Sequence, residues 1–164
     1  MYSSIVQVFL IRHAAAVDET LELRDPYRHL TPHGRAQARG LGDRLRWYDC
    51  VPTHVWTSPL ARAVQTAELL VGAMASTVCV EIVPALAPDG SPRDVAAAVR
   101  ALDPAAAVML VGHEPSLSGI GALLVGALDF ESLGKAEAAR IVDGVLRWRC
   151  AWDAEAPVPA APRR

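Results

Sequence analysis

Short apolar runs alternate along the chain with stretches in which apolar residues recur every three or four positions. The run from Val6 to Ile11 is rich in β-branched residues, as in a strand buried on both faces, and it ends on Arg12 and His13. Similar runs predict three more strands, over residues 53–57, 78–83 and 106–111. Helical periodicity predicts four helices, over residues 32–47, 59–71, 92–102 and 117–125.

Three of the predicted helices begin with the same signal, a hydroxyl-bearing residue followed by proline. The pairs are Thr31-Pro32, Ser58-Pro59 and Ser91-Pro92. A serine or threonine oxygen can accept a hydrogen bond from the first turn of a helix, and proline suits the first helical position. We therefore expect the three hydroxyl residues to be N-caps.

After residue 128 the pattern changes to that of a β-hairpin. Residues 138–142 and 145–151 are predicted strands joined by the tight turn Asp143-Gly144. The Pro- and Ala-rich segment 154–164 is predicted to be a mobile tail. The whole pattern predicts an α/β fold in a single domain over residues 1–153. That fold is a three-layer αβα sandwich with a mainly parallel sheet and an antiparallel C-terminal hairpin.

Composition narrows the class of protein. The 164 residues are 52% hydrophobic with a formal net charge of −2, which suits a globular domain and gives no general attraction to nucleic acid or membrane. Cys50, Cys79 and Cys150 are odd in number and far apart, which argues against a disulfide framework or a zinc site and favours a cytoplasmic location. No apolar stretch is long enough to span a bilayer, and the N-terminus lacks the features of a signal peptide.

Polar residues follow three of the predicted parallel strands at the point where each strand ends. Arg12 and His13 follow the first strand, Ser58 and Arg62 follow the second, and His113 follows the fourth. Right-handed crossovers place all strand-to-helix loops at one edge of a parallel sheet. These residues can therefore converge on one pocket although they are far apart in the sequence.

Arginines and helix N-termini that meet at one point favour a compact, multiply charged anion, because guanidinium groups bind phosphate oxygens in a bidentate way. The sequence has no P-loop and no acidic cluster, so we expect neither a metal ion nor a cofactor. A histidine beside such a site indicates phosphoryl transfer through histidine. Neighbouring cations would lower the pKa of His13 and keep its ring neutral. A backbone carbonyl bonded to one ring nitrogen would aim the lone pair on the other.

Three segments resemble, in order and spacing, the motifs of the histidine phosphatase superfamily, which has the phosphoglycerate-mutase-like fold. They are residues 10–14 (Leu-Ile-Arg-His-Ala), 58–67 (beginning Ser-Pro-Leu-Ala-Arg) and 111–115 (Val-Gly-His-Glu-Pro). The small size of the chain and the segments 28–34 and 84–90 resemble the SixA-type phosphohistidine phosphatase branch.

This resemblance implies a role for each residue that matches a motif. His13 corresponds to the nucleophile that becomes phosphorylated, and water then hydrolyses the phosphohistidine intermediate. Arg12, Arg62 and His113 correspond to the residues that hold the phosphoryl oxygens and stabilise the transition state. The implied enzyme is a phosphatase that needs no metal.

One element of the superfamily is missing. Larger members carry, after the third strand, a glutamate that donates a proton to the leaving alcohol, whereas residues 85–88 contain no acid, as in SixA-like members. An alkoxide needs a proton in the transition state, but imidazole can leave a phosphoramidate already protonated. The sequence therefore favours phosphohistidine on a protein as the substrate, and Asp18, Asp89 and Glu114 remain candidate proton donors.

Other interpretations stay open at the level of sequence. Ser58 fits an N-cap or a phosphate ligand, and Glu114 also fits the first turn of the next helix. Arg28 and His29 fit a solvated rim or a contact to substrate. The same residues could serve a phosphomonoesterase acting on a small phosphorylated metabolite, or a non-catalytic module that binds phosphorylated ligands.

Overall fold

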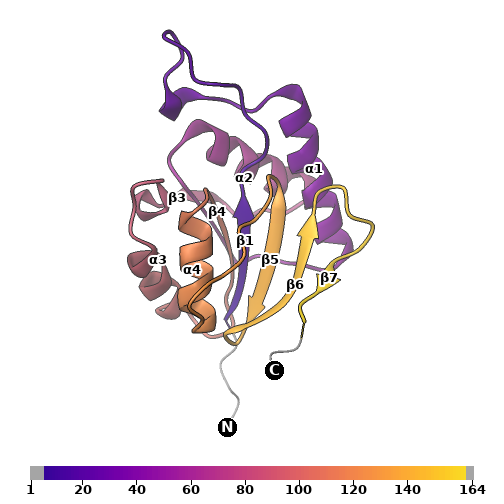
Figure 1. The fold of residues 1–164 in the computed structure, drawn as a ribbon. Coiled ribbons are helices and arrows are strands. Elements are labelled where there is room, and N and C mark those ends of the chain that lie inside the picture. The colour runs from indigo at the N-terminus through magenta and orange to yellow at the C-terminus, as the bar shows by residue number, and fades with distance from the viewer. Residues whose placement is uncertain (1–5, 162–164) are drawn as a thin grey trace.

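The computed structural model describes residues 6–161, and a seven-stranded sheet forms its centre (Figure 1). The spatial order of the strands is β3-β2-β4-β1-β5-β6-β7. Their bounds are β1 Gln7–Arg12, β2 His54–Thr57, β3 Val80–Ile82, β4 Ala107–Gly112, β5 Glu137–Val142, β6 Val145–Ala151 and β7 Val158–Pro159. The first four pair in parallel and the last three pair antiparallel, as the predicted α/β pattern requires.

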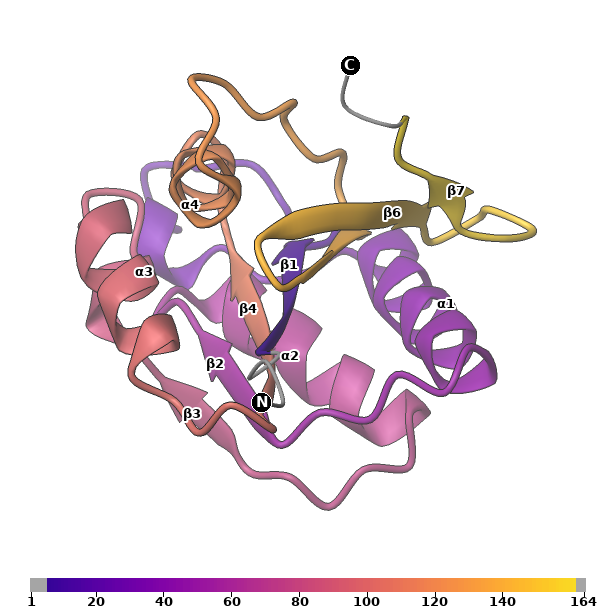
Figure 2. The ribbon, with the colours of Figure 1, turned by 90° about the horizontal axis from the view of Figure 1, so that it is seen from below.

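Helices cover both faces of the sheet. Their bounds are α1 Pro32–Trp47, α2 Ala61–Ala73, α3 Pro92–Arg100 and α4 Ser116–Val125. Figure 2 shows α1 and α2 on one side of the sheet and α3 and α4 on the other, which confirms the three-layer sandwich. None of the helices within residues 6–161 has the length and apolar character needed to cross a membrane.

The central strand β1 contributes to two separate hydrophobic cores because successive side chains of a strand point to opposite faces. Val8 and Leu10 pack with the side chains of α3 and α4. Phe9 and Ile11 pack with those of α1 and α2. All four side chains are buried, so the run predicted from β-branched and apolar residues is indeed covered on both sides.

Two of the three predicted N-caps are confirmed. Thr31 accepts a hydrogen bond from the Gly34 amide at 2.9 Å, and Ser91 accepts one from the Asp94 amide at 3.2 Å. The prediction for Ser58 is wrong, because α2 begins at Ala61 and no side chain caps it. The proline after Ser58 therefore belongs to the turn before the helix, and the serine hydroxyl is free for another partner.

The segment that follows β1 is held close to the N-terminal end of α1. A Cβ atom on Gly34 would lie 1.9 Å from the carbonyl oxygen of Ala15, so only glycine permits this approach. The amide of Ala15 also donates to the Gln37 side chain at 2.9 Å. These contacts fix the path of the chain where it leaves β1, directly after Arg12 and His13.

The C-terminal hairpin forms as predicted, with Asp143 and Gly144 both at positive φ in the turn. The segment predicted to be a mobile tail contains strand β7, which pairs with Trp148 and Arg149 of β6. Its composition gave no sign of this pairing, because the bonds are made by the backbone. Residues 162–164 of the predicted tail lie outside the described residues.

Candidate active site

The parallel register of the sheet brings the predicted site residues together. Arg12, the last residue of β1, is paired with Gly112 of β4, and the amide of His13 donates to the Gly112 carbonyl at 3.0 Å. On the other side of β4, the Ser58 amide donates to the Val111 carbonyl at 2.9 Å. His13, Ser58 and His113 therefore follow neighbouring strands at one edge of the sheet, and Arg62 joins them from the first turn of α2.

His13 is held in a defined tautomer by two hydrogen bonds. Its Nδ1 lies 2.7 Å from the Ala14 carbonyl oxygen, which can only accept, so Nδ1 carries the proton. Its Nε2 is 3.3 Å from Nε of Arg62, which can only donate, so Nε2 presents its lone pair. The structure thus supplies the carbonyl that the sequence analysis expected to aim the ring.

The electrostatic surroundings of His13 keep its ring neutral. Burial of the side chain, which is 7% exposed, is the main cause that lowers the pKa from 6.5 to about 4. The bond to Ala14 acts in the opposite direction, and the positive charges of Arg62 and Arg12 lower the pKa further. A neutral imidazole with an unprotonated nitrogen is a competent nucleophile at neutral pH.

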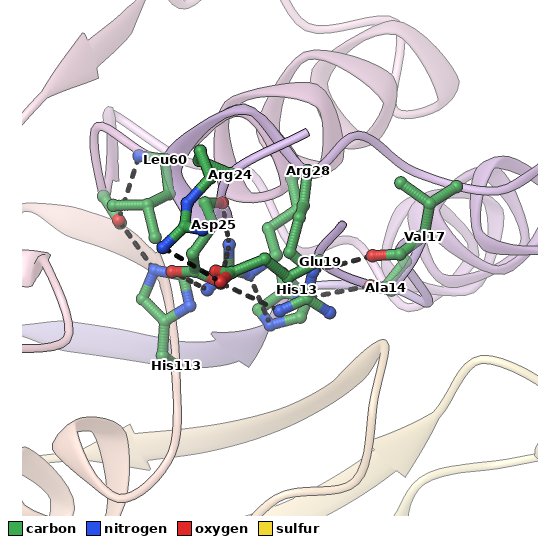
Figure 3. Close-up of polar contacts among 11 residues, drawn as sticks. His13, Ala14, Val17, Glu19, Arg24, Asp25, Arg28, Leu60 and His113 are labelled. Atoms are coloured by element: carbon green, nitrogen blue, oxygen red, sulfur yellow. Dashed lines mark hydrogen bonds and ion pairs between the residues drawn. The ribbon is translucent and has the colours of Figure 1, made fainter. Parts of the chain in front are cut away.

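His113 faces His13, and the two ring centroids are 5.1 Å apart (Figure 3). Its Nε2 lies 2.7 Å from the Ser58 hydroxyl oxygen, and that oxygen accepts from the Leu60 amide at 3.3 Å. If Ser58 donates its proton to Nε2, the proton of His113 is on Nδ1, which is buried and has no partner within residues 6–161. Burial and then the neighbouring His13 lower the pKa of His113 to about 3.

The Arg12 side chain is held by the segment that joins α4 to β5. Its Nη1 donates to the Leu133 carbonyl at 3.0 Å, and its Nε is buried without a partner among the described residues. The Leu133 amide donates in turn to Oε1 of Glu114 at 3.0 Å. The second oxygen of Glu114 accepts from the Ser118 amide of α4 at 3.2 Å, which agrees with the helix-capping interpretation of this carboxylate.

Asp25 is the site residue that sequence reasoning missed. Its carbonyl accepts from Nη1 of Arg62 at 3.0 Å, and its carboxylate lies 3.3 Å from the same nitrogen. Arg28 donates to this carboxylate at 2.9 Å, and that bond is the main cause that lowers the pKa of Asp25. The available signal was the spacing of Asp25 three residues before Arg28, which suits an ion pair in a tight turn.

The other candidates lie apart from this cluster. Asp18, His29 and Asp89 are exposed, and the structure records no hydrogen bond or ion pair within residues 6–161 from their side chains to the arginines or histidines of the site. Nor do the described residues contain a group of three His, Cys, Asp or Glu side chains that could hold a metal ion. What converges is a set of guanidinium and imidazole groups, which suits a phosphate-sized anion.

Comparison with known proteins gives the family of the chain. The family model of the histidine phosphatase superfamily (branch 1) matches residues 8–87, the part that holds Arg12, His13 and Arg62. The chain belongs to this superfamily. An uncharacterized protein of Picosynechococcus sp. is 32% identical to this phosphatase over 114 residues, which are 68% of each chain.

Similar solved structures indicate which branch of the superfamily the chain belongs to, and they share its fold. The structure of the protein histidine phosphatase SixA in complex with tungstate superposes on this phosphatase with a TM-score of 0.82. The two sequences are 25% identical, and the match covers 89% of this chain and 97% of the SixA chain. Phosphoglycerate mutase from Bacillus anthracis shares the fold at 17% identity, with coverage of 87% and 90% and a TM-score of 0.62. The chain is therefore a phosphatase of the SixA type that works through a histidine intermediate, and the alternative of a non-catalytic module is set aside.

Proposed function

We propose that this phosphatase removes the phosphoryl group from phosphohistidine on a protein, with His13 as the nucleophile. The two hydrogen bonds of His13 support this role, because they place the proton on Nδ1 and the lone pair on Nε2. When phosphate oxygens take over the Arg62 guanidinium, that lone pair can attack phosphorus. The low pKa of the ring, about 4, keeps that lone pair unprotonated at neutral pH. The Ala14 carbonyl, which accepts the Nδ1 proton, stabilises the positive charge that the ring acquires when Nε2 is phosphorylated.

Arg12, Arg62 and His113 bind the phosphoryl oxygens in this mechanism. Nε of Arg12 and Nδ1 of His113 are buried polar atoms without partners among the described residues, and a buried donor without an acceptor is costly. An oxyanion bound next to the His13 ring would satisfy both. The tungstate in the related SixA structure supports this view, since tungstate has the charge and tetrahedral shape of a phosphate group.

The reaction then proceeds in two transfers. Nε2 of His13 forms a bond to phosphorus while the N–P bond of the substrate breaks, and the electron pair returns to the substrate imidazole. That imidazole leaves neutral because its other ring nitrogen already carries a proton. A water molecule next attacks phosphorus, the bond to His13 breaks, and inorganic phosphate leaves with the remaining water proton passing to solvent.

The preference for an N–P bond rests on the state of the carboxylates near the site. Asp25 contacts Arg62, but its pairing with Arg28 lowers its pKa and keeps it ionised, so it has no proton to donate at neutral pH. Both carboxylate oxygens of Glu114 accept hydrogen bonds from backbone amides. Residues 84–86 form a short helical turn beside the end of β4, and they carry no acid. A leaving alkoxide would lack a proton donor here, whereas a leaving imidazole does not need one.

The test compares substrates and follows the intermediate. A histidine-containing protein phosphorylated with phosphoramidate should be hydrolysed faster than a panel of phosphomonoesters. A brief reaction with labelled substrate should give an acid-labile, alkali-stable phosphoenzyme that His13→Ala lacks. His54→Ala is the matched control, because His54 lies at the opposite end of β2. Faster turnover of a monoester would reject phosphohistidine as the substrate, and an adduct that persists in His13→Ala would reject His13 as the nucleophile.

A further inference from the structure

Arg149 on β6 makes a dense set of bonds that the proposed mechanism does not use. Its guanidinium donates to the Glu131 carbonyl at 3.0 Å and to the Ser132 carbonyl at 2.7 Å. It also pairs with both carboxylate oxygens of Glu137, at 2.9 and 3.2 Å. Its side chain is 17% exposed, so this cluster is shielded from solvent far more than an ordinary surface ion pair.

Arg149 and Glu137 bind the backbone immediately before and immediately after Leu133 in the chain. Arg149 holds the two carbonyls that precede Leu133, and Glu137 accepts from the amide of Gly134, which follows it, at 2.6 Å. The carbonyl of Leu133 is the acceptor for Nη1 of Arg12. The orientation of this one carbonyl is therefore set by bonds made on either side of it.

Apart from these bonds, the segment is anchored at Leu133 itself, whose side chain is buried and whose amide donates to Oε1 of Glu114 at 3.0 Å. The neighbouring residues Glu131, Ser132, Gly134 and Lys135 are exposed, and the segment joins α4 to β5 without regular secondary structure. Arginine suits the task because its planar fork can bind two carbonyls and a carboxylate at once, which a lysine ammonium cannot do with the same geometry.

We propose that Arg149 and Glu137 are positioning residues that orient Arg12 toward the phosphoryl group through the Leu133 carbonyl. This inference rests on the proposed role of Arg12 in binding phosphate. It assigns a function in the site to a side chain on β6 that follows Arg12 by 137 positions in the sequence. Loss of the Arg149–Glu137 pair leaves the guanidinium of Arg12 in place chemically but allows it to turn away from the anion.

The test uses inorganic phosphate as the probe, with titration calorimetry for its Kd and steady-state kinetics for KM and kcat. Arg149→Met should raise the Kd for phosphate and lower kcat/KM on the order of 10- to 100-fold, the scale expected from misplacing a positioned group. Arg149→Lys and Glu137→Gln, which disturb the fold less, should each give part of this loss. Arg147→Met is the matched control, because it removes the same charge from the same strand and its side chain makes no recorded hydrogen bond within residues 6–161.

A double-mutant cycle with Arg12→Ala separates the possible outcomes. If Arg149 and Glu137 act through Arg12, Arg149→Met has no further effect on the Kd for phosphate in a protein that already carries Arg12→Ala. The proposal is overturned if Arg149→Met behaves like Arg147→Met, or if its loss is the same in both backgrounds. If Arg12→Ala itself binds phosphate and turns over substrate like the wild type, the proposed role of Arg12 fails, which is a different result.

Discussion

The two buried histidines make the stability of the fold sensitive to pH. His13 and His113 are 7% and 4% exposed, and burial is the main cause that lowers their pKa values from 6.5 to about 4 and about 3. In the unfolded chain both rings take up a proton as the pH falls through 6.5, whereas in the folded protein both remain neutral. The unfolded state therefore binds more protons, and the free energy of unfolding must decrease as the pH falls.

The loss of stability follows from the difference between the pKa of the unfolded histidines and the pH of the measurement. At about pH 5 the unfolded histidines are about 1.5 units below their pKa, and each unit is worth about 1.4 kcal/mol. Each ring thus costs about 2 kcal/mol of stability relative to about pH 7.5, or about 4 kcal/mol for the pair. Mutual repulsion between the rings does not enter, since neither is protonated in the folded state at that pH.

Urea unfolding in phosphate-free buffer at about pH 7.5 and about pH 5 measures the loss directly. His13→Asn should show a loss about 2 kcal/mol smaller than the wild type, and a variant that also carries His113→Asn should show a loss about 4 kcal/mol smaller. Carboxylates contribute equally to all three proteins, so the differences isolate the histidines. An equal loss in all three would refute the neutral, buried state of His13 on which the proposed mechanism depends.

Three further predictions concern single contacts. Arg62→Ala should lower kcat/KM on the order of 10²- to 10³-fold with phosphohistidine protein, because it removes a charged donor to the transition state; a change below threefold would contradict this. Ser58→Ala removes the hydroxyl bonded to His113 Nε2, and kcat should fall about tenfold in steady-state assays, the scale of one unsatisfied buried group. Unchanged kcat would show that the ring needs no such partner. Gly34→Ala should lower the free energy of unfolding by about 1–3 kcal/mol, because its Cβ would lie 1.9 Å from a backbone oxygen. Gly72→Ala, with nothing within 4 Å of the added atom, is the control and should not destabilise the protein in the same urea titration.

Much of the fold and the centre of the site can be predicted from the sequence because they depend on local patterns. The apolar run from Val6 to Ile11 predicts a buried strand, and the Thr31-Pro32 pair predicts where α1 begins. Parallel topology then brings the ends of the strands together, since crossovers of one hand leave all the loops on the same edge. His13 and His113 become neighbours for this reason, although one hundred positions separate them.

The partners of these residues could not be predicted in the same way. Ser58 carries the sequence signal of an N-cap, yet its hydroxyl bonds to His113 because the preceding strand ends beside β4. Asp25 contacts Arg62 only because the loop after β1 folds back over α2. Neither contact has a local pattern, since each depends on the path that a loop takes across the sheet edge.

The sequence by itself therefore determined that two histidines and two arginines end up at one edge of an α/β sheet. Hydrophobic periodicity and the handedness of crossovers are sufficient for that result. The tertiary structure alone decided which ring nitrogen of His13 carries the lone pair, that Asp25 is ionised beside Arg62, and that Arg12 donates to the Leu133 carbonyl. These features arise from burial and from hydrogen bonds between distant segments, and both exist only once the chain is packed.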